Sequence, residues 1–397
     1  MRRAGSSLFA LLAVAAGAIA ANLYYAQPLL PTIAADLAVP ARRVGALPMA
    51  TQLGYGAGML LLVPLGDRLE RRGLIVAMTG LSSVVLVGVA LARELDTLVA
   101  ASFLLGFASM VPQVIVPYAA TAAPQDSRGR RVGTVMSGLL VGILLSRTLS
   151  GFVGAAWGWR SVYFLAAGLM LALAALLALR LPAQRPEVPV ATGEIYASLG
   201  RIFARQPILR LHSLLGAMTF GAFSVFWSTL AFQLAALPPH YGSVVVGAYG
   251  LVGVSGALAA PLVGRFADRR DPRILNGLAI VATLGSFGIF AVGASSLAAL
   301  AVGVVLLDVG AQANHVSNQT RIFGLDAALR SRLNTIYMTS YFAGGALGSW
   351  VGAWAWSRAG WPGVCGAGAA MAAIALVALV REVARRAPRG RRYPAAS

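Results

Sequence analysis

The chain has 397 residues, of which 58% are hydrophobic and only 11% are charged, and its formal net charge is +19. A soluble protein of this size carries about a quarter charged residues, so the composition excludes an ordinary soluble domain and indicates that lipid is the solvent. The positive charge does not indicate a nucleic-acid-binding protein, because the arginines stand in short clusters between apolar runs.

The apolar runs, taken in chain order, predict transmembrane helices, each of which needs about 20 mostly apolar residues. The first run follows MRR and looks like a cleavable signal, but it continues to Pro28 and similar runs follow, so we predict an uncleaved first span. Twelve spans are predicted, near residues 7–30, 44–65, 74–92, 97–121, 133–156, 161–180, 209–235, 243–264, 274–294, 297–320, 335–356 and 361–380.

The arginines between these spans predict the orientation. Of the 32 arginines, 26 fall in alternate segments that include both termini, 5 fall in the other segments, and Arg147 lies within a span. Cytoplasmic segments are enriched in arginine, so we predict a multi-pass protein of the bacterial inner (plasma) membrane with both termini in the cytoplasm.

One charged motif occurs twice, as VPLGDRLERRG at 63–73 and as PLVGRFADRRDPR at 261–273, about half the chain apart. QDSRGRRVGT at 125–134 and LDAALRSRLNT at 325–335 repeat with a similar offset. Transporters are often built from such repeats. We therefore predict a six-helix N-terminal half at 1–180, a cytoplasmic linker at 181–208, a six-helix C-terminal half at 209–381 and a basic cytoplasmic tail at 382–397.

Twelve of the 13 acidic residues fall in loops or at span ends, and Asp308 alone lies well inside a span. It stands about 11 residues from the outer end, which is about 16 Å deep in a core of about 30 Å. Ionisable groups at such a depth are usually functional, so we predict that Asp308 takes up and releases protons. The alternative is a static pair with Arg147, which also lies near mid-span.

Polar residues follow Asp308 at helical spacing and define a stripe that should face a cavity or another helix rather than lipid. His315 is a candidate proton relay, although a hydrogen-bonded packing role is equally compatible with the pattern. The other polar residues of this span, Gln312, Asn314, Asn318 and Gln319, are candidate substrate-binding residues.

Further candidates for substrate binding lie on other spans. Phe220, Phe223 and Trp227 form an aromatic stripe on the seventh span, which suits flat or apolar solutes but is also typical of helix packing. The remaining candidates are polar or charged groups within spans: Asn22, Tyr25, Gln113 and Arg147.

The duplicated motif resembles the loop between the second and third spans of major facilitator superfamily transporters, roughly G-x-x-x-D-R-x-G-R-R. The resemblance covers essentially the whole chain and implies an all-α membrane fold with twelve transmembrane helices in two pseudo-symmetric halves around a central cavity. It also implies a cytoplasmic conformational latch. The matching residues are Asp67, Arg68, Arg71 and Arg72 in the first copy, where Val63 and Glu70 replace the glycines, and Gly264, Asp268, Arg269 and Arg273 in the second.

The stretch GILLSRTLSG at 142–151 resembles the fifth-span motif G-x-x-x-G-P-x-x-G-G of twelve-span drug:proton antiporters. Gly142 and Gly151 match it. Ser146, Arg147 and Ser150 stand where Gly, Pro and Gly are usual. Small residues allow close helix packing, so we assign Gly142, Ser146, Ser150 and Gly151 to helix packing. The fourth-span arginine of that family is replaced by Ser102.

We therefore expect a proton-coupled exporter of small organic molecules or drugs, working as a monomeric antiporter in the lipid bilayer. The alternatives are a dedicated transporter of a metabolite such as a nucleoside or sugar, and a transport-inactive membrane sensor. We expect no enzymatic activity, no cofactor and no bound nucleic acid. The three histidines and single cysteine are scattered, which predicts no metal site, and a phosphate-binding loop is excluded because the chain has no Lys.

Overall fold

The computed structural model describes residues 6–67, 69–184, 192–253, 272–326 and 329–386. Within these ranges the chain is a bundle of helices without a strand. The long helices before residue 185 are α1 (Ser6–Ala21), α4 (Ala46–Leu62), α5 (Arg71–Leu91), α6 (Leu95–Ala108), α7 (Pro112–Ala122), α8 (Arg128–Trp157) and α9 (Trp159–Arg180). Those after residue 191 are α10 (Thr192–Arg205), α11 (Pro207–Trp227), α13 (Ser243–Val252), α15 (Pro272–Val292), α16 (Leu297–Phe323) and α17 (Arg330–Arg386).

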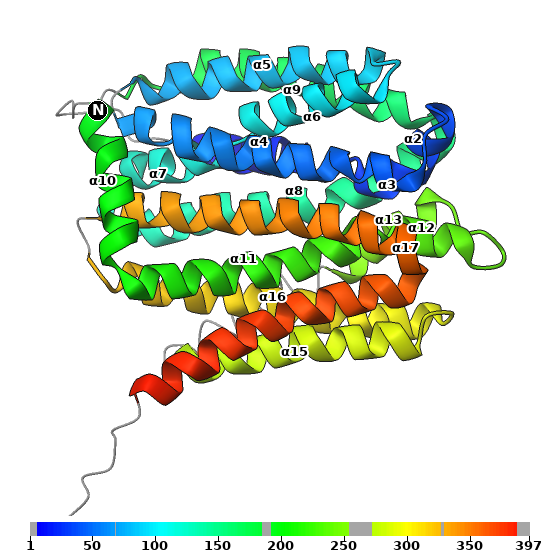
Figure 1. Ribbon diagram of the computed structural model, residues 1–397. Coiled ribbons are helices and arrows are strands. Elements are labelled where there is room, and N and C mark those ends of the chain that lie inside the picture. The colour runs from blue at the N-terminus through cyan, green and yellow to red at the C-terminus, as the bar shows by residue number, and fades with distance from the viewer. Residues whose placement is uncertain (1–5, 68, 185–191, 254–271, 327–328, 387–397) are drawn as a thin grey trace, which may run out of the picture.

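Figure 1 shows the helices running roughly side by side, with α5, α9, α6 and α4 above α11, α16 and α15. Helix α10 stands across one end of the bundle, where it contacts α11 and α17. We call this end the linker end and the opposite end the far end. Helix α4 packs against α17, and α8 packs against α13, so these two pairs join α1–α9 to α11–α17.

Nine of the described helical stretches are long and apolar enough to cross a membrane, and two shorter apolar helices occur at Ser7–Ala21 and Ser243–Val252. Helix α17 contains two of the predicted spans, because Ala359 and Gly360 leave the helical conformation between them. Gly360 has a φ of 57°, which glycine adopts without the steric cost of a side chain. The predicted span 243–264 is described only as far as Val252 and Gly253, so the full count of twelve remains a prediction.

Three predicted spans, 7–30, 97–121 and 209–235, each contain a break in the helix. The first stops at Ala21 and resumes as a 3₁₀ turn, Gln27–Leu29, and α2 (Leu30–Asp36). The second stops at Ala108 and resumes as α7. Prolines explain both breaks, since Pro28 and Pro112 occupy the first positions of the resumed segments and cannot donate a backbone hydrogen bond.

The third break has a different cause, because no proline is near it. Helix α11 stops at Trp227, and α12 (Leu230–Ala236) follows. The Ser228 hydroxyl donates to the Ser224 carbonyl, and the Thr229 hydroxyl donates to the Val225 carbonyl at 2.7 Å. Side-chain hydroxyls that bond to the carbonyl four residues back compete with the helix ladder and bend it.

The far end of the bundle is closed by contacts between α1–α9 and α11–α17. Thr148 Oγ1 donates to the Gly247 carbonyl at 2.8 Å, and Ser243 Oγ donates to the Gly151 carbonyl at 2.9 Å. The short helix α3 (Ala41–Val44) also packs against α17, and α2 packs against α12. Small residues permit this approach, since a Cβ on Gly151 would lie 2.4 Å from the Ser243 carbonyl oxygen.

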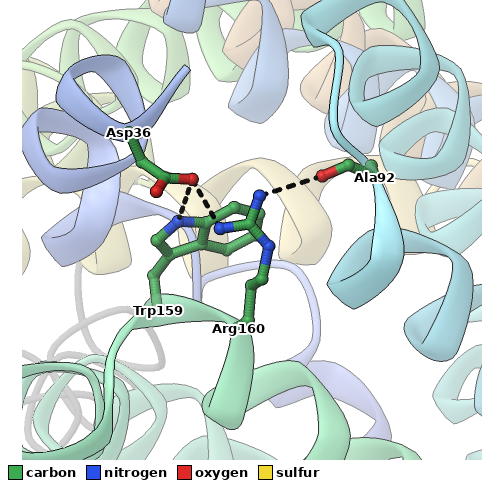
Figure 2. Close-up of polar contacts among 4 residues, drawn as sticks. All are labelled: Asp36, Ala92, Trp159 and Arg160. Atoms are coloured by element: carbon green, nitrogen blue, oxygen red, sulfur yellow. Dashed lines mark hydrogen bonds and ion pairs between the residues drawn. The ribbon is translucent and has the colours of Figure 1, made fainter. Parts of the chain in front are cut away.

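A polar cluster fastens three helix ends within α1–α9 at the far end (Figure 2). Arg160 Nη1 pairs with Asp36 Oδ2 at 2.5 Å, and Arg160 Nη2 donates to the Ala92 carbonyl at 3.2 Å. Trp159 Nε1 donates to the same Asp36 oxygen at 3.2 Å. The hydrogen bond from Arg160 holds the pKa of the Asp36 carboxyl below its usual range. The cluster ties the end of α2 to the start of α9 and the end of α5.

Candidate functional site

Arg147 lies on α8 with only 2% of its surface exposed. Its Nε donates to Gln27 Oε1 at 2.7 Å. Its Cζ lies 4.2 Å from the Trp227 ring centre and 4.6 Å from the Tyr24 ring centre. The break after α1 brings Tyr24 and Gln27 to this position, and the aromatic faces stabilise the buried cation.

Asp308 lies on α16 and is 8% exposed. Its Oδ1 accepts a hydrogen bond of 3.3 Å from Nε1 of Trp227, the last residue of α11. Gly253 leaves space for the other carboxyl oxygen, since a Cβ there would lie 2.4 Å from Asp308 Oδ2. The carboxyl is therefore enclosed by α11, α16 and the end of α13.

Arg147 and Asp308, both within the described residues, are joined through Trp227 rather than by a direct ion pair. The indole ring faces the guanidinium, and its N–H donates to the carboxylate. The roles of the two charges, proton coupling or a static tie between helices, stay predictions. Because Arg147 comes from α8 and the other two come from α11 and α16, the arrangement spans the contact between α1–α9 and α11–α17.

Among the residues that the structure describes, two buried polar atoms of these segments have no hydrogen-bond partner, Arg147 Nη2 and Asn22 Oδ1. Asn22 Nδ2 donates to Ser109 Oγ at 3.2 Å, which links the breaks in the first and fourth spans. An unpartnered buried donor costs about 1–3 kcal/mol. Arg147 Nη2 therefore favours any group that brings an acceptor to it.

The aromatic stripe of α11 continues from this site toward the linker end. Phe223 lies 6.0 Å from Trp227, and Phe220 stacks on Phe223 at 5.6 Å between ring centres. Phe220 also stacks on Tyr341 of α17 at 4.0 Å, and the His315 ring lies 4.9 Å from Tyr341. An unbroken row of rings thus joins Asp308 to the second predicted ionisable residue of α16.

His315 is half-buried, and its Nδ1 lies 3.0 Å from the Tyr337 hydroxyl. Gly216 makes room for that tyrosine, since a Cβ there would lie 2.7 Å from its ring. Gln312 and Gln319, on the same stripe as His315, are also half-buried. The stripe of α16 is therefore less enclosed than the asparagine row beside it.

The two asparagines of α16 lie in a separate buried network. Asn318 Nδ2 donates to Asn314 Oδ1 at 2.8 Å, and Asn276 of α15 bonds to both side chains at 3.1 and 3.2 Å. His212 of α11 lies 2.7 Å from Asn318 Oδ1. All four side chains are buried, so their polar atoms hold α11, α15 and α16 together.

The remaining predicted binding residues lie within α1–α9. Gln113 Nε2 donates to the Tyr55 hydroxyl at 3.1 Å, and this tyrosine packs on Phe342 at 4.3 Å. Tyr25 is 6% exposed and lies one residue beyond the ring that faces Arg147. Its neighbour Tyr24, rather than Tyr25, makes the contact with the guanidinium.

Gln52 is a buried polar residue that was not predicted from the sequence. It lies on α4, yet its Nε2 donates to Ser349 of α17 at 3.1 Å, and its Oε1 accepts from Ser224 of α11 at 3.5 Å. Gly345 leaves space for it, since a Cβ there would lie 2.0 Å from Gln52 Oε1. A polar residue near the start of an apolar span was the available signal.

The predicted latch is described only in part. Arg71 Nη1 donates to Thr121 Oγ1 at 3.3 Å, and Arg72 Nη2 donates to the Ala178 carbonyl at 2.6 Å. Arg273 lies near the start of α15. Four predicted members of the latch lie outside the described residues: Arg68, Gly264, Asp268 and Arg269. The side chain of Asp67 is not described either.

The small residues of α8 pack in two directions. A Cβ on Gly142 would lie 2.3 Å from the Gly17 Cα of α1, whereas Gly151 faces α13. Ser146 and Ser150 are fully buried and donate to carbonyls of their own helix. Helix α8 therefore makes close contacts on both sides of Arg147.

Comparison with known proteins identifies the family. The chain matches the Major Facilitator Superfamily over residues 12–324. It belongs to this superfamily. The similar proteins include an uncharacterized transporter, YgaY, of Escherichia coli K12, which is 42% identical over 92% of this chain and 93% of its own length. A chloramphenicol resistance protein of Streptomyces lividans is 29% identical over 67% of this chain and 68% of its own.

Solved structures agree with the superfamily fold. A mutant of the nucleoside transporter NupG superposes with a TM-score of 0.74 at 14% identity, covering 96% of this chain and all of the other. At this identity the likeness establishes the fold alone. The family match and the transporters among its relatives show that the chain is a multi-pass membrane transporter of the Major Facilitator Superfamily.

Proposed function

We propose that this protein is a proton-coupled antiporter that exports small organic molecules by alternating access. The observation that carries the proposal is the Arg147–Trp227–Asp308 arrangement, in which a buried carboxyl is linked to a buried cation across two groups of helices. Intramembrane acids are costly and usually mark ion or substrate pathways.

The chemistry follows from charge. An ionised Asp308 accepts the Trp227 hydrogen bond and attracts Arg147, which strengthens the contact between α8 and the helices α11 and α16. Protonation removes that charge and weakens the contact. If the proton and the solute favour opposite states, a proton gradient drives the solute.

One relative and the aromatic row support the proposed class of solute and the proposed direction of transport. The row formed by Phe220, Phe223 and Trp227 suits flat or apolar molecules. The chloramphenicol resistance protein of Streptomyces lividans is named for resistance to a small organic compound, which supports export. We place the protein in the bacterial inner membrane as a monomer, with the linker end in the cytoplasm and with halves at 1–180 and 209–381.

The test is transport in proteoliposomes under an imposed pH gradient, with a panel that includes chloramphenicol, nucleosides and sugars. One proton exchanged for one neutral solute supports about tenfold accumulation per pH unit. Asp308→Asn should fold and exchange solute downhill but lose this accumulation, because asparagine keeps the size and hydrogen-bonding capacity of aspartate but cannot take up or release a proton. Asp96→Asn, at a side chain that is 88% exposed, is the matched control.

Equal accumulation by Asp308→Asn and the parent protein would remove Asp308 as the coupling residue. Solute flux that is independent of the pH gradient in the parent protein would remove proton coupling altogether. A response to nucleosides or sugars alone would favour a dedicated metabolite transporter.

A further inference from the structure

A pocket of about 350 Å³ lies at the linker end, between the start of α11 and the end of α17. Three arginines and one acid line it, Arg210, Arg381, Arg385 and Glu382, together with the apolar Leu211 and Ala378. The lining therefore carries an excess of two positive charges. None of these residues belongs to the site around Asp308.

We propose that this pocket binds the phosphate headgroup of an anionic phospholipid. Three arginines line one small space, and each guanidinium offers a planar set of donors that matches phosphate oxygens. Arg210 uses Nη1 to bond the Ala204 carbonyl at 2.9 Å, which fixes its position and leaves further N–H groups for a ligand.

The apolar surface beside the pocket suits the acyl chains of the same lipid. Leu214 stands one helical turn deeper than Arg210 on α11, and Val377 stands one turn deeper than Arg381 on α17. Residues four apart share a helix face. Leu214 is 40% exposed and Val377 is 48% exposed, although both lie within membrane-spanning helices. A charged rim above an exposed apolar face is the arrangement that a phospholipid requires, and a soluble phosphate would use only the rim.

The position of the pocket gives such a lipid a structural effect. The pocket joins the first turn of α11 to the last turns of α17, and α10 contacts both helices. A lipid phosphate between Arg210 and Arg381 would offset the mutual repulsion of the arginines. Bound lipid should therefore stabilise this end of the protein.

The experiment measures lipids retained by the purified full-length protein in native mass spectrometry, with a matched thermal unfolding series. The probes are phosphatidylglycerol, phosphatidylcholine and glycerol phosphate. We compare the parent protein with Arg381→Gln/Arg385→Gln and with the control Arg128→Gln/Arg130→Gln. The control removes two arginines from another segment between spans, at the start of α8. Each arginine should contribute about fivefold to binding, so the first double variant should bind phosphatidylglycerol roughly 30-fold more weakly.

The proposal holds if the parent and the control retain one phosphatidylglycerol in preference to phosphatidylcholine and the pocket variant does not. Equal retention by the pocket variant, or an equal loss in the control, would overturn it. Equal retention of phosphatidylcholine would show that the arginines do not select the headgroup. Equal thermal stabilisation by glycerol phosphate would show a soluble anion site instead. If the double variant does not fold, Arg385→Gln alone should still weaken binding about fivefold, and unchanged binding there would also overturn the proposal.

Discussion

Adding one methyl group at Gly345 should open the far end of the transporter. Gly345 lies on α17 where α4 and α11 meet it, and a Cβ there would lie 2.0 Å from Gln52 Oε1 and 2.5 Å from the Phe220 ring. Both distances are far below van der Waals contact. Gly345→Ala must therefore displace two buried side chains, one from each group of helices.

The magnitude follows from the cost of overpacking. Extra methyl groups in a packed core cost about 1–3 kcal/mol. The clash with Gln52 exists only while α4 lies against α17. This part of the cost therefore destabilises only the conformation in which the far end is closed. If this part is about 1 kcal/mol, the lower end of the range, the ratio of open to closed molecules changes roughly fivefold.

The assay is a spin-label distance measurement across the far end. Thr97 and Ser295 are exposed and belong to different groups of helices, so labels there, in a Cys365→Ala background, report on opening. Gly345→Ala should increase the long-distance population at least about fivefold. Gly88→Ala is the matched control, because nothing lies within 4 Å of the Cβ that it adds. An unchanged distance distribution in Gly345→Ala, or the same change in Gly88→Ala, would refute the reasoning.

Two further predictions concern stability. Arg160 lowers the pKa of Asp36 in the folded state. The ionised Asp36 therefore contributes fully to the free energy of unfolding above its unfolded pKa of about 3.9, and this contribution is lost as the pH falls through the lower folded pKa. Asp36→Asn should therefore lower the Tm slightly at about pH 6, by the effect of a surface pair of at most about 1 kcal/mol, and a difference that persists at about pH 2 would contradict this. Asn276→Ala should destabilise the protein by about 1–3 kcal/mol, because Asn314 Nδ2 would lose its acceptor, whereas Asn318 Oδ1 would keep its contact with His212. Thermal unfolding in detergent measures both effects, and an unchanged Tm in Asn276→Ala would show that these amides find other partners.

The spans were predictable because bilayer thickness sets the length of an apolar helix, whatever packs beside it. The membrane class and most helix positions follow from that single rule. The breaks in three spans lie at or beside Pro28, Pro112 and the pair Ser228–Thr229, which are visible signals in the sequence. Proline and serine also occur in continuous membrane helices, and tertiary contacts decide whether they bend or end the helix.

The candidate site was predictable in its charges but not in its contacts. Asp308 and Arg147 stood out because each is a charge within an apolar span. Their connection through Trp227 could not be predicted, because it depends on how α8, α11 and α16 face one another. Asn314 and Asn318 also could not be assigned to their network from the sequence. Each lies one position before a residue of the half-buried stripe, yet both belong to a buried amide network.

The breaks in the spans and the buried charges belong to one arrangement. The break after α1 brings Tyr24 and Gln27 to Arg147, and the break after α11 leaves Trp227 between Arg147 and Asp308. On α8, the residue after Arg147 is Thr148, which bonds to Gly247 of α13 at the closed far end. Trp227, Arg147 and Thr148 therefore connect Asp308 to the helix contact that closes the far end. In a proton-coupled cycle, this physical connection would let one proton change the balance between two conformations.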